Sequence, residues 1–159
     1  MRRGASPQQK KITTETYRGT SLRLVKKFSG EIFMSNTLII IGGIFHLGFA
    51  VFHLFFWRLF NWKKDLASLT YINRAVMQIL NLCLTFVFFV AAYISIFHSR
   101  ELVATSLGNV ILVSISAFWL LRFIEQIIFF GLKKRLSITL TVLFFAGFVI
   151  YLFPLFFIV

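Results

Sequence analysis

Four long runs of uncharged, mainly hydrophobic residues dominate the sequence, at residues 32–57, 75–99, 102–121 and 136–159. Each run reaches the roughly 20 residues that an α-helix needs to cross about 30 Å of hydrocarbon. Lipid offers the backbone no hydrogen bonds, so a helix is the structure that such runs adopt in a membrane. The pattern predicts an all-α fold, a polytopic membrane bundle of four transmembrane helices with short loops, with spans at about 36–57, 75–97, 103–131 and 137–158.

The third run continues beyond residue 121 to residue 132, and this part contains the charged residues Arg122 and Glu125. A charge at the centre of a membrane helix costs about 2.5–3.5 kcal/mol, whereas each Leu, Ile, Phe or Val returns about 0.3–0.6 kcal/mol. The i, i+3 spacing places both side chains on one helical face, which Gln126 shares. We expect the two charges to pair and to turn away from lipid, either as a unit that joins helices or as a ligand or proton site.

Further polar residues lie at comparable depths in the first two spans. At 1.5 Å per residue, counted from the end that carries the first and third loops, they lie roughly 6 to 14 Å below the membrane surface. This count gives the depth of each residue, but it does not show which side of one helix faces another helix. We predict an intramembrane polar layer, with His46 deeper than the rest, near the midplane, that consists of His46, His53, Gln78, Asn81, Arg122, Glu125 and Gln126.

His46 and His53 share a face of the first span but lie about 10.5 Å apart along its axis. Bonds from zinc to histidine nitrogen measure about 2.0–2.1 Å, so a single ion does not reach both. Hydrogen bonding between helices is the preferred interpretation, although a haem could use one histidine with a partner on another helix. The sequence shows no metal-spaced cluster, no catalytic Ser/His/Asp set and no phosphate loop, so we predict no catalytic residue, no metal and no cofactor, and an enzymatic function lacks support.

Small and aromatic residues give three expectations about packing. Glycines in the first span permit close approach of helices, and the single cysteine, Cys83, is expected in the core. Trp57 and Trp62 flank the first loop and are expected to anchor it at the membrane interface. The glycines concerned are Gly42, Gly43 and Gly48.

Composition and charge support the membrane interpretation. The chain of 159 residues is 58% hydrophobic and contains 22 phenylalanines, whereas a soluble domain is about 45–50% apolar. Its net charge of +12 would fit nucleic acid, but the basic residues lie in the N-terminal tail and in short loops, where membrane topology accounts for them. The predicted partner is therefore the lipid bilayer and not nucleic acid, with a homo-oligomer or a membrane-protein partner left open.

The first 33 residues differ from the rest, because they are basic, rich in Ser and Thr and without a long apolar run. We expect residues 1–33 to be a disordered or interfacial tail, in which residues 21–33 have a weak amphipathic pattern that would lie on anionic lipid. Residues 34–159 then form the transmembrane domain. Met34 precedes the first span as a natural start would, and with this start the positive-inside rule places the first and third loops in the cytoplasm.

The sequence also resembles a family of small four-span bacterial inner-membrane proteins of uncharacterised activity. This resemblance covers about residues 42–151 and implies four membrane helices, a multi-pass position in a bacterial inner membrane and a start at Met34. It implies no activity. The residues that carry it are His46, His53, Trp62, Asp65, Leu66, Leu69, Asn73, Arg74, Phe118, Trp119, Arg122 and Gln126.

Two functions remain in view from the sequence. The first is a structural or interaction subunit, whose polar layer packs the helices. The alternative is a small transporter, channel or ligand-binding membrane protein, in which Arg122, Glu125 and His53 serve protons or a polar solute.

Overall fold

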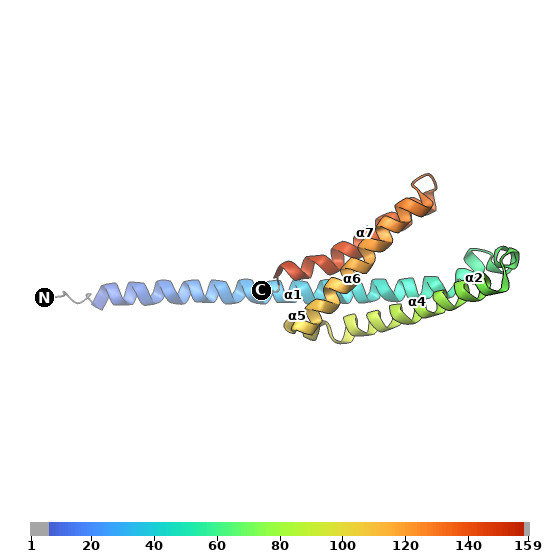
Figure 1. Ribbon diagram of the computed structural model, residues 1–159. Helices are drawn as coiled ribbons and strands as arrows, with labels where there is room; N and C mark the ends of the chain where they lie inside the picture. Colours follow the sequence, from blue (N-terminus) through green and yellow to red (C-terminus); the bar gives the residue numbers. More distant parts are fainter. Residues whose placement is uncertain (1–6, 158–159) are drawn as a thin grey trace. The chain divides into compact units, whose positions relative to one another are not determined.

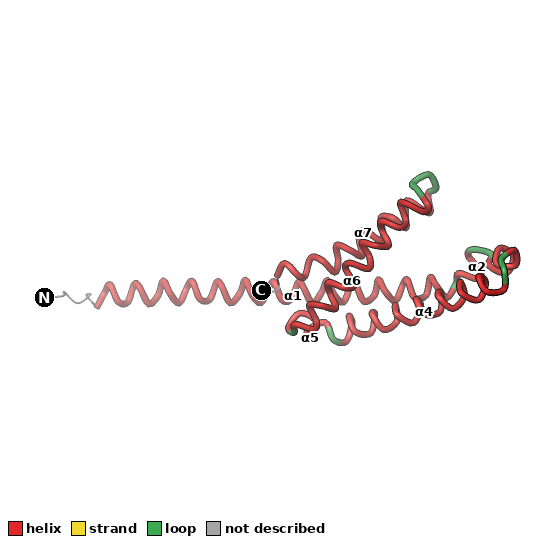
Figure 2. The backbone as a smooth tube through the Cα atoms, in the orientation of Figure 1, coloured by secondary structure: helices red, strands yellow, loops and turns green. Residues whose placement is uncertain are grey.

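The chain is all-helical in the computed structural model, which describes residues 7–157 and gives side chains for residues 26–157 (Figures 1 and 2). Helix accounts for 92% of it, and the described residues include no strand. The elements are α1 (Pro7–Leu54), α2 (Phe56–Leu59), α3 (Trp62–Asp65), η1 (Leu66–Ser68), α4 (Tyr71–Phe97), α5 (Ser99–Ala104), α6 (Ser106–Glu125), η2 (Gln126–Phe130), α7 (Arg135–Leu152) and η3 (Phe153–Phe157).

Four helical segments are long and apolar enough to cross a membrane, as the sequence predicted. They are Lys26–Leu54, Tyr71–Phe97, Ser106–Phe130 and Arg135–Phe157. The structure divides into two units, Met1–Met34 and Ser35–Val159.

The described part of the first unit is helical, where the sequence left disorder or an interfacial position open. Residues 7–34 belong to α1, and Lys27 forms a 3.8 Å ion pair with Glu31 one turn later. Such an i, i+4 pair supports a helix by a few tenths of a kcal/mol. Residues 1–6, and the side chains of residues 21–25 in the expected amphipathic pattern, lie outside the described part.

The ends of the predicted spans differ from those of the helices, because hydropathy does not reveal capping. Thr70 caps α4 by accepting a hydrogen bond from the Asn73 backbone N–H at 3.4 Å, and Thr105 caps α6 by accepting one from Gly108 at 2.9 Å. The first loop therefore spans the residues between Leu54 and Tyr71 and contains three short helical turns. The second loop is longer than predicted, because α5 forms a separate helix before α6.

The inward faces of the long helices follow a repeat of three and four residues, which is typical of packed helices. Many of the buried positions on these stripes are small or hydroxyl-bearing, as expected where helices approach closely in a membrane. On α4 the stripe consists of Asn81, Thr85, Phe88, Ala92 and Ser95. Cys83 lies off this stripe and is exposed, so the expectation that it is a core residue was wrong.

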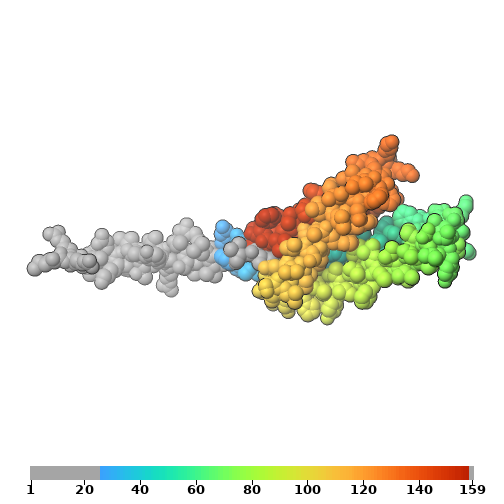
Figure 3. Space-filling model, viewed as in Figure 1, coloured from blue at the N-terminus to red at the C-terminus, as the bar shows by residue number. Residues whose placement is uncertain are grey.

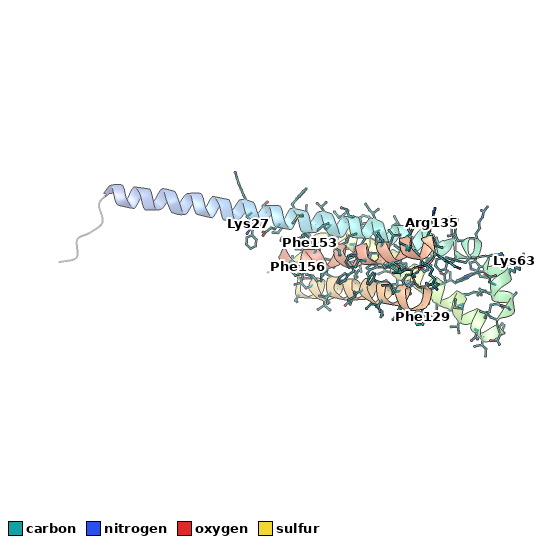
Figure 4. All side chains as sticks on the ribbon, turned by 90° about the horizontal axis from the view of Figure 1, so that it is seen from above. Lys27, Lys63, Phe129, Arg135, Phe153 and Phe156 are labelled. Atoms are coloured by element: carbon teal, nitrogen blue, oxygen red, sulfur yellow. The ribbon has the colours of Figure 1, made fainter. Side chains whose placement is uncertain are left out.

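Two pairs of helices make up the second unit. The hairpin of α6 and α7 crosses the pair formed by residues 35–54 of α1 and by α4, and the two pairs diverge towards the first and third loops (Figure 1). Figure 3 shows a notch between them at this end. In Figure 4, Lys63, Phe129 and Arg135 lie towards this end, whereas Phe153 and Phe156 lie towards the opposite one.

Gly42 allows α7 to approach α1, as its position in the first span predicted. A Cβ atom at residue 42 would lie 2.6 Å from the ring of Tyr151, and one at Gly43 would lie 2.6 Å from Ile96 on α4. A Cβ atom at Gly48 would meet nothing within 4 Å. The expectation of close approach therefore holds at Gly42 and Gly43 and was wrong at Gly48.

The change Gly42→Ala should destabilise the protein by about 1–3 kcal/mol, because the added methyl group overpacks the contact with Tyr151. Gly48→Ala, on the same helix, is the matched control and should leave stability unchanged or slightly raised. Chemical unfolding in detergent micelles measures both changes. Equal effects of the two changes would contradict the close contact at Gly42.

Candidate functional site

The deepest polar feature is a hydrogen-bonded chain that takes one side chain from each of the four long helices. The indole N–H of Trp119 on α6 donates to Nε2 of His46 on α1 at 3.2 Å. Nδ1 of His46 lies 2.8 Å from the hydroxyl of Tyr151 on α7, which lies 2.8 Å from the hydroxyl of Ser95 on α4. All four side chains are at most 2% exposed. We call these four residues the deep network.

Hydrogen-bond roles within the deep network follow from the donors available. An indole nitrogen only donates, so Nε2 of His46 accepts and a neutral ring carries its proton on Nδ1. This proton has two acceptors, the Tyr151 hydroxyl and the Gly42 carbonyl oxygen at 3.1 Å. The Tyr151 hydroxyl that accepts from His46 is free to donate to Ser95. Both ring nitrogens of His46 are therefore satisfied within the network, which leaves His46 no free position for a haem iron or another ligand.

His53 lies two turns further along α1 and pairs with Asn81 of α4. The Asn81 side-chain amide donates to the His53 carbonyl oxygen at 3.1 Å, so its own oxygen faces Nδ1 of His53, at 2.9 Å. Nδ1 is therefore the donor, and Nε2 of a neutral His53 is an acceptor. Both residues are 7% exposed, and the His53 ring stacks on Phe56 with 4.1 Å between centroids.

Arg122 and Glu125 on α6 form an ion pair. Nη1 of Arg122 donates to a carboxylate oxygen of Glu125 at 2.8 Å, and the two side chains are 33% and 34% exposed. The guanidinium carbon of Arg122 also lies 5.2 Å from the centroid of the Phe144 ring on α7. This distance is within the range of a cation–π interaction, which adds to the electrostatic stabilisation of the charge.

Gln126 begins a wide π-helical turn, η2, at the end of α6. Such turns are rare, and they occur often at functional sites. The Gln126 side chain is 3% exposed, and its nitrogen donates to the Ser137 hydroxyl of α7 at 3.0 Å. Ser137 in turn donates to the carbonyl oxygen of Gly131. Gly131 has a φ of 62°, which glycine adopts without steric cost, and ends the turn.

A pocket of about 840 Å³ lies between the diverging helix pairs of the second unit. Its walls are mainly aromatic rings from α1, α4, α6, α7 and the first loop. Polar side chains line it from three of the long segments, with His53 on the first, Arg122 and Gln126 on the third and Ser137 on the fourth, while Asp65 and Lys134 line it from the loops. Trp119 lines the pocket as well as belonging to the deep network, so its indole borders both.

The structure thus arranges the predicted polar layer as separate groups. His46 lies in the deep network, His53 pairs with Asn81, and Arg122, His53 and Gln126 line one pocket. Glu125 pairs with Arg122 but does not line the pocket. Gln78 is half-buried, and the described residues make no hydrogen bond to its side chain that would join it to these groups.

Sequence reasoning missed Ser95, Ser137 and Tyr151, and it did not assign Trp119 to the polar groups. Serine and tyrosine are common in membrane helices, so their presence alone gives little signal. Tyr151 was the best available indication, because a deeply placed hydroxyl needs a partner. Trp62 is 8% exposed and packs 5.6 Å from the Phe56 ring, centroid to centroid, and its position at a membrane interface stays a prediction.

Within the described residues, no group of three or more His, Cys, Asp or Glu side chains could hold a metal ion. No protein-family model matches the chain, and neither a curated protein nor a solved structure is significantly similar to it. Function is therefore inferred from the site itself.

Replacing Tyr151 with Phe should destabilise the bundle by about 0.6–1.7 kcal/mol, the range measured for interhelical hydrogen bonds in membranes. The change removes the hydroxyl that joins His46 to Ser95 and leaves the ring in place. Tyr93→Phe is the matched control, because Tyr93 is 57% exposed on α4. Thermal unfolding in detergent reports both variants, and an equal loss in Tyr93→Phe would argue against the deep network.

Replacing one partner of the ion pair, by Arg122→Met or Glu125→Gln, should destabilise the protein more than replacing both, because a single change leaves an unpaired charge. The double-mutant cycle should give a coupling energy of about 0.5–3 kcal/mol. Arg100→Met, at an exposed cation of the second loop, is the control for loss of charge alone. Strictly additive single effects would show that the two side chains act independently.

Proposed function

We propose that this chain is a multi-pass membrane protein that binds an apolar small molecule from the bilayer in the pocket between its helix pairs. Membrane insertion is supported by the four long apolar helices and by large apolar side chains exposed on all of them, such as Ile44, Phe86, Val110 and Val142. In water such a surface would aggregate, whereas in lipid it is the expected exterior. Position in a bacterial inner membrane is part of this proposal and rests on the resemblance.

The pocket is the single observation that carries the binding proposal. Ligand sites in proteins measure about 300–1,000 Å³ and combine apolar walls with a few oriented polar groups. The pocket has about 840 Å³, many aromatic side chains in its walls and six polar or charged side chains, among them His53, Arg122 and Gln126. Two of these side chains, His53 and Gln126, are held in place by Asn81 and Ser137. Preorganised groups of this kind bind without loss of side-chain entropy.

A structural or interaction subunit is the second candidate, and the deep network favours it. This network joins all four long helices and would fix their packing whether or not the pocket binds anything. In this case the exposed apolar faces would meet a second copy or another membrane protein. The two candidates differ in their predictions for a variant whose pocket is blocked. The binding candidate predicts that such a variant loses bound apolar molecules, whereas a structural subunit need not bind any.

The change Leu140→Trp fills the pocket from α7 and should lower the fraction of protein that retains a bound apolar molecule by about tenfold. Such a loss corresponds to about 1.4 kcal/mol of binding energy. Leu143→Trp is the matched control, because Leu143 is exposed on the same helix and does not line the pocket. Native mass spectrometry from mild detergent measures retention in both variants.

Equal retention in Leu140→Trp and Leu143→Trp would mean that bound molecules coat the outer surface, and the binding proposal would then fail. Leu69→Trp fills the pocket from the first loop instead. It gives the same test if tryptophan at residue 140 prevents folding.

A further inference from the structure

Arg122 lines the pocket, and the described residues use only a small part of its hydrogen-bonding capacity. A guanidinium has five N–H donors, and among the described residues Glu125 is its one hydrogen-bond partner, through Nη1. Arg122 lines the pocket, whereas Glu125 does not. The ion pair therefore uses a carboxylate that does not belong to the pocket lining, and it leaves the other N–H groups of the guanidinium without a hydrogen-bond partner among the described residues.

Unused donors in an apolar pocket are costly, because neither lipid nor aromatic rings replace their hydrogen bonds to water. An oxyanion from a ligand would satisfy them best, since the planar fork of arginine matches the two oxygens of a carboxylate or a phosphate. Ligands without such a group would leave these donors unpaired in the bound state.

The remaining polar groups of the pocket leave the recognition of an anion to Arg122. Nε2 of a neutral His53 and the side-chain oxygen of Gln126 are acceptors, which suit a hydroxyl on the ligand, and the Ser137 hydroxyl already donates to Gly131. Lys134 adds a positive charge and Asp65 a negative one at the loop side of the pocket, so these two offset each other. Arg122 is thus the group that distinguishes an acid from a neutral ligand.

We infer that the pocket selects an apolar acid with a single hydrocarbon chain, whose carboxylate or phosphate pairs with Arg122 and whose chain lies against the aromatic walls. This inference rests on the proposed function and adds the chemical class of the ligand. A volume of about 840 Å³ suits one molecule of drug-like size. The acid need not displace Glu125, which bonds to Nη1 of the guanidinium and does not line the pocket.

Tryptophan fluorescence provides the test, because two of the three tryptophans, Trp62 and Trp119, line the pocket. The variant Trp57→Phe removes the third, which is 46% exposed. Full-length protein in detergent is titrated at alkaline pH with dibromostearic acid, with a brominated alkyl phosphate and with dibromostearic acid methyl ester. Bromine quenches tryptophan at short range, so saturable quenching reports binding in the pocket.

The acid or the phosphate should reach half-maximal quenching at a concentration at least about tenfold lower than the ester, as one charge-assisted hydrogen bond implies. Whichever of the two is preferred identifies the head group. In the double variant Arg122→Met/Glu125→Gln, which leaves no unpaired charge, the preference should vanish while the ester still binds. Lys133→Met, at an exposed cation that does not line the pocket, is the matched control and should keep the preference, and Arg122→Lys should keep part of it.

Equal binding of both acids and the ester to the wild-type pocket would overturn the inference and leave the proposed function standing. Absence of saturable quenching by all three would remove both. A preference lost in Lys134→Met but kept in the Arg122 variants would overturn the role of Arg122, because the acid would then be held at the pocket entrance.

Discussion

The rest of this structure depends on one constraint, which is that buried polar atoms need hydrogen-bond partners within the protein because water is excluded. His46 meets it by accepting from Trp119 and donating towards Tyr151 and Gly42, so α1, α6 and α7 are joined at one ring. Ser95 adds α4 through Tyr151. Hydrogen bonds of this kind determine which helices meet, since the apolar contacts around them have little directional preference.

The deep network and the pocket depend on each other through Trp119. Its indole N–H serves the network, while its ring stacks parallel to Phe88 at 5.7 Å and packs against Phe49 at 4.8 Å, both measured between centroids. These rings form part of the pocket wall. The same side chain therefore joins helices through its N–H and borders the space where the helix pairs have separated.

Sequence patterns predicted the number of membrane-length helices, and the i, i+3 spacing placed Arg122 and Glu125 where they pair. They did not predict which face of each helix is buried, as Cys83 and Gly48 show. When a helix is hydrophobic on all sides, its sequence shows how far each residue lies from the helix end, but not which side of the helix faces its neighbours. The deep network was missed for a related reason, because Tyr151 and Ser95 acquire their roles only through partners on other helices.

The wide turn of η2 has a consequence for comparison with other sequences. Its hydrogen bonds close over five residues instead of four, so the segment holds an additional residue in nearly the same axial length. The Ser137 hydroxyl accepts a hydrogen bond from Gln126 at the start of this turn and donates one to Gly131 after it. Ser137 therefore connects the two ends of the wide turn. A relative with a regular α-helix here would be one residue shorter, and its correct alignment would place the gap inside a helix.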